Sequence, residues 1–170
     1  MSAEAIVNQL LSSSNWDNIK DKINELEIAY VNKLIENIVT YVDSEISIEN
    51  LELVSTYSMA EEISQEITGI PASYSAIDGD ASAMVQFAEQ YSHLGVTEFD
   101  ELAKEVLLDF LNLHNGLYIV QLSNLNICEL SLSVPKQNGE IKLTSPINGN
   151  IIVIPINFKF GTVKFLLCRL

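Results

Sequence analysis

The sequence is short of basic residues, and this shortage limits the partners it can have. Its nine Lys and Arg are outnumbered by 23 Asp and Glu, which gives a formal net charge of −14. Nucleic-acid binding requires a basic patch, and nine scattered cations do not form one. We therefore expect no DNA or RNA partner.

Long apolar runs are also missing. The longest, IIVIPI at 151–156, is far shorter than the roughly 20 residues that span a bilayer. The N-terminal stretch MSAEAIVNQLLSSS has no basic leader, and Glu4 and Asn8 interrupt its apolar positions, which argues against a signal peptide. We expect a cytoplasmic protein with no membrane partner.

Motifs built on cysteine, histidine or glycine are mostly absent. Cys128 and Cys168 lack the spacing of a metal knuckle or a redox pair, so both are predicted to be reduced core residues. His93 and His114 are the only histidines, and neither has a second His at helical ligand spacing, so no metal site is expected. For His114 the simpler interpretation is a favourable interaction with the end of a helix, although its nearness to Asn112 leaves a functional role open. The glycine-rich phosphate loop, the dinucleotide turn and the nucleophile elbow are all missing.

The apolar residues that are present, 48% of the chain, suffice for the core of one domain. Their spacing predicts two short helices within residues 1–27 and a helix of about four turns from 28 to 42. Residues 1–27 are therefore a predicted helical extension, followed by one domain over 28–170. Three extended segments are expected next, at 49–58, 61–69 and 70–79.

Two more helices are predicted in the middle of the chain. Asp78 and Asp80 precede the first, where they alternate like calcium ligands, but the helix starts too early for a calcium loop and N-capping explains them better. Gly95 supplies a C-terminal stop. Thr97 with Asp100 resembles a capping box for the second helix, which is expected to end at Gly116.

Everything after Gly116 reads as strand, in segments 117–123, 126–134, 139–145, 150–158 and 162–170. Asn-Gly pairs at 138–139 and 148–149 indicate turns, and Pro155 indicates a sheet edge or a bulge. The predicted fold class is α+β, with helices packed on an antiparallel sheet and a loose internal duplication of a helix followed by three strands.

One helix face carries a row of polar residues, Glu101, Glu105, Asp109 and Asn112, which fall on a narrow strip at 100° per residue. Most rows of this kind are solvated surface. This one has no Lys at i+4 to offset its carboxylates, and the same exposed face carries Leu108. The mild repulsion among the carboxylates suggests a partner.

The spacing of this row resembles that of the CheC and CheX type of chemotaxis phosphatases. Their pattern is an acidic residue or Ser, three residues, Glu, two residues, Asn, twenty-two residues and Pro. The sequence matches it with Glu105, Asp109, Asn112 and Pro135. The first long helix, NELEIAYVNKLIENIV, has no second copy, so the resemblance is to single-site CheX and covers residues 28–170.

The resemblance implies a dimeric protein that removes the phosphoryl group from the aspartate of a CheY-type response regulator. Asn112 would orient the attacking water, and Asp109 would anchor the active-site Lys of the receiver. Glu105 and Leu108 would bind the receiver with Asp109, and Pro135 would have a structural role in the motif. No cofactor of its own is implied, because the receiver supplies Mg²⁺.

Asp109 stands where the family has Glu, and the lost methylene withdraws the carboxylate by ~1.5 Å. A misplacement of this size can cost on the order of a hundredfold in rate. Two functions therefore stay open from the sequence: a receiver phosphatase, or a catalytically weak dimeric module that binds a phosphorylated receiver without efficient hydrolysis.

Overall fold

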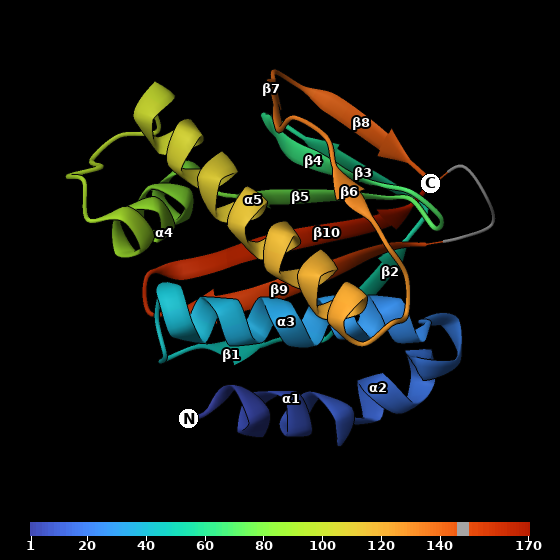
Figure 1. Cartoon of the computed structure of the whole chain (residues 1–170). Coiled ribbons are helices and arrows are strands. Elements are labelled where there is room, and N and C mark those ends of the chain that lie inside the picture. The colour runs from blue at the N-terminus through green and yellow to red at the C-terminus, as the bar shows by residue number, and fades with distance from the viewer. Residues whose placement is uncertain (146–149) are drawn as a thin grey trace.

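The computed structural model describes residues 1–145 and 150–170, which form helices laid across an antiparallel sheet (Figure 1). The predicted α+β class is confirmed, whereas the predicted turn at 148–149 lies outside the described residues. The elements in chain order are α1 (Ala3–Leu11), α2 (Ser14–Ile19), η1 (Lys20–Lys22), α3 (Glu25–Tyr41), β1 (Ser47–Ile48), β2 (Glu52–Val54), β3 (Thr56–Met59), β4 (Glu62–Thr68), β5 (Ser73–Gly79), α4 (Ala81–Ser92), α5 (Glu101–Asn124), β6 (Ser131–Leu132), β7 (Lys136–Asn138), β8 (Ile141–Thr144), β9 (Ile151–Phe158) and β10 (Gly161–Arg169). None of the described helices is both long and apolar enough to cross a membrane.

Local sequence explains where α3 begins. The Asn24 side chain accepts a hydrogen bond from the Glu27 N–H at 2.8 Å, and the Glu27 side chain accepts from the Asn24 N–H at 2.9 Å. This reciprocal capping box starts the helix at Glu25, a few residues before the apolar stripe predicted from residue 28. The stripe itself is buried against the sheet, as its helical spacing predicts.

The main sheet has the order β1-β9-β10-β5-β4-β6, with β2 added to β9 and β7 added to β4. Its helix-covered face and the helices enclose the larger core. The opposite face is covered by the two-stranded β3–β8 sheet, which encloses a smaller core that includes Met59, Tyr74, Leu166 and Cys168. α3 and α5 cross the larger core side by side (Figure 1).

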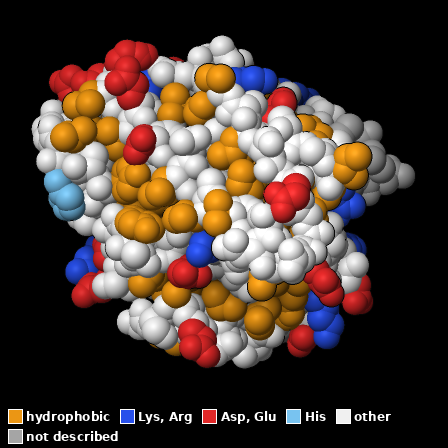
Figure 2. All heavy atoms as spheres, in the orientation of Figure 1, with side chains coloured by type: hydrophobic (Ala, Val, Ile, Leu, Met, Phe, Trp, Pro, Cys, Tyr) orange, Lys and Arg blue, Asp and Glu red, His pale blue; other side chains and the backbone are white. Residues whose placement is uncertain are grey.

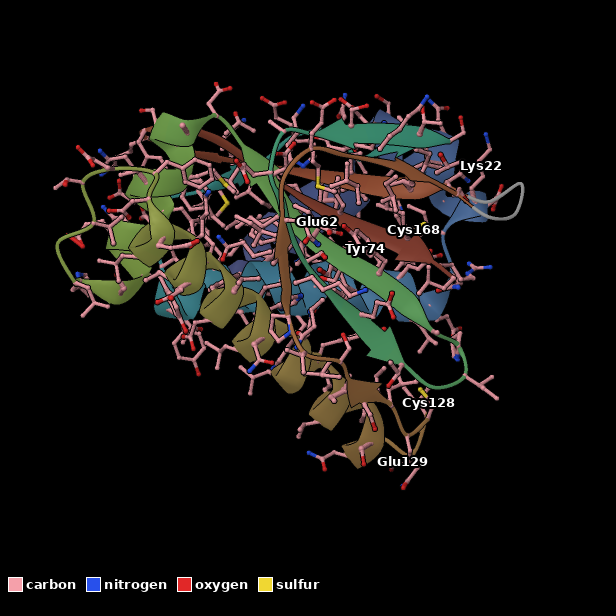
Figure 3. All side chains as sticks on the ribbon, turned by 90° about the horizontal axis from the view of Figure 1, so that it is seen from above. Lys22, Glu62, Tyr74, Cys128, Glu129 and Cys168 are labelled. Atoms are coloured by element: carbon pink, nitrogen blue, oxygen red, sulfur yellow. The ribbon has the colours of Figure 1, made fainter. Side chains whose placement is uncertain are left out.

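The smaller core holds a buried carboxylate, Glu62. Its Oε2 accepts from the Tyr74 hydroxyl at 2.7 Å and the Ser64 hydroxyl at 3.0 Å, and its Oε1 accepts from Asn138 Nδ2 at 2.6 Å. Glu62 on β4 and Tyr74 on β5 lie next to each other (Figure 3). Burial alone would raise the pKa of Glu62, but these hydrogen bonds together lower it.

The two halves of the chain are related by a pseudo-two-fold axis. The central strands β5 and β10 pair antiparallel with Ala76 opposite Leu166, β4 and β9 flank them, and β3 pairs with β8. β1 and β2 add to β9 as β6 and β7 add to β4. Among the described residues each half thus has a long helix followed by five strands, so the predicted duplication is present with five strands in place of three.

The helices obey the same symmetry. Five of the seven buried positions of α3 repeat in α5 with the same spacing; the matching pairs are Glu27 and Leu111, Tyr30 and His114, Val31 and Asn115, Leu34 and Tyr118, and Ile38 and Leu122. Tyr30 and His114 are counterparts that contact each other, with ring centroids 4.6 Å apart. The pseudo-axis therefore passes between the two helices, and each residue near the site has a definable counterpart.

The prediction that the second long helix ends at Gly116 is wrong. α5 continues to Asn124, and residues 117–123 are helix where a strand was predicted. Tyr118 and Leu122 are buried at helical spacing from His114, so packing on the sheet outweighs the cost of one mid-helix glycine, about 1 kcal/mol. Of the following segment, 126–134, only Ser131–Leu132 is strand.

The predicted helix boundaries in the middle of the chain need smaller corrections. α4 ends at Ser92 because His93 takes a left-handed conformation, before Gly95. Asp100, and not Thr97, is the N-cap of α5, and it accepts from the Ala103 N–H. Asp80 holds the N-cap position of α4 but makes no side-chain capping bond.

Pro155 lies on β9 opposite the break between β1 and β2, which suits a residue without an N–H. Ile48 of β1 pairs with Ile156 and Glu52 of β2 pairs with Val153, while between them the Glu49 N–H donates to the Pro155 carbonyl at 3.0 Å. The N–H that Pro155 lacks would therefore lie where the pairing of β9 with β1 and β2 is interrupted, so no strand hydrogen bond is lost there.

Candidate functional site

The residues singled out by the spacing come together in one surface depression. It has a volume of about 390 Å³ and is lined by Glu105, Leu108, Asp109, Asn112 and Pro135. The first four lie on α5, and Pro135 follows β6 on the segment that runs past the helix. Glu105, Asp109 and Asn112 are exposed, so their side chains are accessible to a partner.

A second hollow, of about 490 Å³, adjoins the depression and shares Glu105 and Asp109 with it. Its walls include Leu94 and Leu102, which are large apolar side chains exposed to solvent. The face that carries α5 shows apolar side chains among scattered carboxylates (Figure 2). The site is thus an open surface with apolar and acidic character and is not an enclosed pocket.

Glu101, the first residue of the polar row, is held outside the depression. Its two carboxylate oxygens accept from Gln137 Nε2 on β7 at 2.6 and 3.0 Å. This contact ties the start of α5 to the sheet. The row therefore splits into one structural residue and three that face the depression.

Asp109 is oriented by a tyrosine that the sequence pattern did not single out for the site. The Tyr91 hydroxyl, on α4, donates to Asp109 Oδ2 at 2.8 Å. Burial and the neighbouring carboxylate raise the pKa of Tyr91, so the hydroxyl keeps its proton and remains a donor at neutral pH. Tyr91 thus engages one oxygen of Asp109, while no hydrogen bond from a residue that the structure describes reaches Oδ1.

Asn112 is oriented from below by Gln65 of β4. Gln65 Nε2 donates to Asn112 Oδ1 at 2.7 Å and to the Ser133 carbonyl at 2.9 Å. Asn112 Nδ2 donates no hydrogen bond to any other residue that the structure describes. Because Asn112 lines the depression, its NH₂ group is available to a partner there, and Oδ1 keeps a second lone pair.

Gln65 is the outer end of a buried polar chain. Its Oε1 accepts from Asn115 Nδ2 at 3.0 Å, and Asn115 Oδ1 accepts from the Ser75 hydroxyl at 3.2 Å. The Tyr30 hydroxyl lies 2.6 Å from Ser75 Oγ and, because the Ser75 proton is already used, donates to it. Burial raises the pKa of Tyr30, so this phenol stays protonated.

His114 does not take part in the depression. It is fully buried in the middle of α5, so the interpretation that it sits at a helix end is wrong. Asn37 Nδ2 donates to its Nδ1 at 2.9 Å, and burial, with a smaller contribution from the Lys33 charge, lowers its pKa to about 3. His114 is therefore a neutral core residue.

Neither cysteine lines the depression or the adjoining hollow, and no metal cluster is visible in the part of the chain that the structure describes. Cys168 is buried as predicted, whereas Cys128 is only partly buried, and both are free (Figure 3). Within residues 1–145 and 150–170, no group of three or more His, Cys, Asp and Glu could hold a metal ion. The chemistry available at the depression is that of two carboxylates and one oriented amide.

The pseudo-axis relates the depression to a second surface that is covered. The counterparts of Asn112 and Pro135 are Ile28 and Leu51, which line a small apolar hollow together with Leu10 and Trp16 of the N-terminal helices. Asn15 Nδ2 also donates to the Leu51 carbonyl at 3.4 Å. α1 and α2 thus lie where a partner of the second site would have to bind.

Comparisons with known proteins bear on the fold. No protein-family model matches the chain, and no curated protein matches it in sequence. Among solved structures, a CheC-like superfamily protein from Shewanella sp. PV-4 is 14% identical with a TM-score of 0.69, and the match covers 93% of this chain and 99% of that one. The chemotaxis protein CheX from Vibrio vulnificus is 12% identical with a TM-score of 0.70, over 86% and 100% of the two chains.

A third similar structure contains a bound partner. It is the complex of CheX with CheY, BeF₃ and Mg²⁺ from Borrelia burgdorferi, 13% identical with a TM-score of 0.65, over 86% of this chain and 98% of that one. These likenesses establish that the chain has the fold of CheC-like and CheX proteins.

Proposed function

We propose that this protein, which has the CheC and CheX fold, hydrolyses the aspartyl phosphate of a CheY-like response regulator. The observation that carries the proposal is the single depression in which Asn112, Asp109, Glu105, Leu108 and Pro135 meet. The fold is shared with a CheX whose structure contains CheY, so the same fold is known to accept a receiver.

The chemistry at the depression fits an acyl phosphate on a protein better than a free anion. Glu105 and Asp109 would repel a small phosphorylated molecule in solution. A receiver, in contrast, brings Mg²⁺ and a Lys beside its phosphoaspartate, as the family resemblance implies. Asp109 Oδ1, which accepts from none of the described residues, can accept from that Lys, and no cofactor of this chain's own is required.

Asn112 would orient the attacking water. The water oxygen bonds to phosphorus opposite the aspartyl oxygen, the phosphorus–oxygen bond to the receiver breaks, and the electron pair remains on the released carboxylate. The free lone pair of Asn112 Oδ1 can accept a hydrogen bond from that water, and its NH₂ can donate to a phosphoryl oxygen. The released proton passes to the phosphate or to solvent.

The test is a screen of the organism's receiver domains, phosphorylated in the presence of Mg²⁺, for accelerated phosphate loss. Asn112→Ala should lower the rate on the responding receiver about a hundredfold, because the water loses its orientation. An unchanged rate in Asn112→Ala would refute the proposed hydrolysis.

A second candidate function is a catalytically weak module that binds a phosphorylated receiver without efficient hydrolysis. Asp109 favours this second candidate. Its side chain is one methylene shorter than the family's Glu, and one of its carboxylate oxygens already accepts a hydrogen bond from Tyr91. Asp109→Glu separates the two: a large gain in rate would indicate a detuned enzyme, whereas tight receiver binding with no hydrolysis in either protein would indicate the module.

We also propose that the protein is a homodimer, as the family resemblance implies. Light scattering of the purified chain across a range of concentrations measures this directly. A constant monomer mass would contradict it without affecting the assignment of the site.

A further inference from the structure

Four buried polar side chains lead from the core to Asn112, and at three of these positions the fold does not need a polar residue. Hydrogen bonds link their side chains in the order Tyr30, Ser75, Asn115 and Gln65, and Gln65 is bonded to Asn112. Gln65, Ser75 and Asn115 have no exposed surface. Buried polar groups of this kind cost free energy unless every one is paired, so their presence calls for a reason.

The other side of the pseudo-axis supplies an internal comparison. Gln65 pairs with Ser75 in the sheet, and across the pseudo-axis Ile154 pairs with Phe165. Asn115 of α5 has Val31 of α3 as its counterpart. The three counterparts are apolar and buried as deeply, so apolar side chains satisfy the same positions of the same fold. On the side of the pseudo-axis that carries the depression, where α5 packs on β4 and β5, these three positions instead hold polar side chains joined by hydrogen bonds.

The donor and acceptor roles in this row of hydrogen bonds are fixed, and a backbone carbonyl fixes them. The Ser133 carbonyl can only accept, so the atom of Gln65 that faces it is the NH₂ nitrogen. The second N–H of that nitrogen points at Asn112, which must present its oxygen. Gln65 Oε1 is in turn fixed by Asn115 Nδ2. The Asn112 amide therefore cannot flip without breaking the bond from Gln65.

We propose that Gln65 is the positioning residue for Asn112: it holds the amide with Oδ1 inward and NH₂ facing the depression. Asn115, Ser75 and Tyr30 hold Gln65 in that orientation. The kinetic consequence rests on the proposed phosphatase function, whereas the ordering of the Asn112 amide does not. Gln65 is buried beneath α5 and acts on a receiver only through Asn112.

The test uses the full chain with Gln65→Met, which keeps the length of the side chain and removes its hydrogen bonds. Ile154→Met is the matched control, because it places the same side chain at the counterpart position. The first readout is the order parameter of the Asn112 side-chain NH₂ from ¹⁵N relaxation. It should fall in Gln65→Met, and it should be unchanged in Ile154→Met.

The second readout is steady-state dephosphorylation of a CheY-like receiver phosphorylated with a small-molecule phosphodonor and Mg²⁺. Gln65→Met should lower kcat about ten- to a hundredfold and leave KM for the receiver within about twofold, because Gln65 does not reach the surface. A merely structural role would instead lower the folded fraction, which a thermal melt of each variant measures.

The outcomes separate the two proposals. An Asn112 amide that is as rigid in Gln65→Met as in the wild type overturns the positioning role. A loosened amide, with hydrolysis that is insensitive to Asn112→Ala, leaves the positioning role standing and rejects the phosphatase. A loosened amide with lower kcat and unchanged KM supports both.

Discussion

At the scale of single residues, His114 makes the stability of this protein depend on pH. Its imidazole is fully buried, and its pKa of about 3 lies below the unfolded value of 6.5. The unfolded chain therefore takes up the proton first as pH falls, and the stability from neutral His114 is present above pH 6.5 and is lost between 6.5 and 3.

We predict that His114→Gln reduces the dependence of the unfolding free energy on pH between 6.5 and 3. The Gln side chain offers an oxygen to the Asn37 amide and does not titrate. Between pH 6.5 and 4.5 the wild type should lose ~2 kcal/mol more unfolding free energy than the variant, because the slope reaches 1.36 kcal/mol per pH unit only well below pH 6.5. Urea unfolding at both pH values measures it, and equal losses would contradict the assignment.

Protonation of Glu62 lowers the stability in a separate, lower pH range. Its pKa is lowered in the folded state, so its contribution is present above the unfolded value and is lost as pH falls below it. The loss that is specific to His114 should therefore be visible before Glu62 protonates.

The site residues differ in how far sequence could predict them. Asn112, Asp109 and Pro135 follow a recognisable spacing, and helix geometry alone places the first two on one face. Gln65 and Tyr91 lie on other elements and reach the site only through tertiary packing. The alternation of β4 predicts that Gln65 points to one sheet face, but not that α5 brings Asn112 above it.

At the scale of elements, α5 shows how packing overrides local propensity. Gly116 was predicted to end the helix, yet the apolar residues beyond it continue the buried stripe. A strand pattern and a helix pattern overlap in LYIVQLS, and only the position of the sheet beneath decides between them.

We predict that Gly116→Ala stabilises the protein by about 0.5–1 kcal/mol, which corresponds to ~2–4 °C in Tm for a full kcal/mol. Gly116 is helical, and no atom lies within 4 Å of an added Cβ. The gain comes from reduced backbone freedom in the unfolded chain, and calorimetry measures it.

Gly95→Ala is the matched control. Its added Cβ would also meet no atom within 4 Å, but its φ is +79°. The substitution should therefore destabilise by roughly 1–2 kcal/mol through backbone strain alone. Equal shifts for the two glycines would contradict this account of α5.

At the scale of the whole molecule, the pseudo-two-fold axis produces two equivalent surfaces and the chain keeps one open. The depression at Asn112 is accessible, while its counterpart at Ile28 and Leu51 is covered by α1 and α2. The extension predicted over residues 1–27 thus contributes Ile6, Leu10 and Ile23 to the main core.

We predict that this extension unfolds together with the rest of the chain. Ile6→Ala should lower the free energy of unfolding by about 2–4 kcal/mol in a single transition, because Ile6 is almost completely buried. Leu11→Ala, at an exposed position of the same helix, should cost far less. A separate early transition for α1 and α2, seen by Trp16 fluorescence, would contradict a shared core.

The measurement that tests the central claim most directly is a single-turnover rate. A phosphorylated CheY-like receiver is mixed with saturating amounts of wild type, Asn112→Ala, or Val120→Ala, which alters an exposed residue of α5 outside the depression. The account predicts rapid phosphate release with the wild type and with Val120→Ala, and a rate about a hundredfold lower with Asn112→Ala. Equal release by Asn112→Ala and the wild type would contradict it.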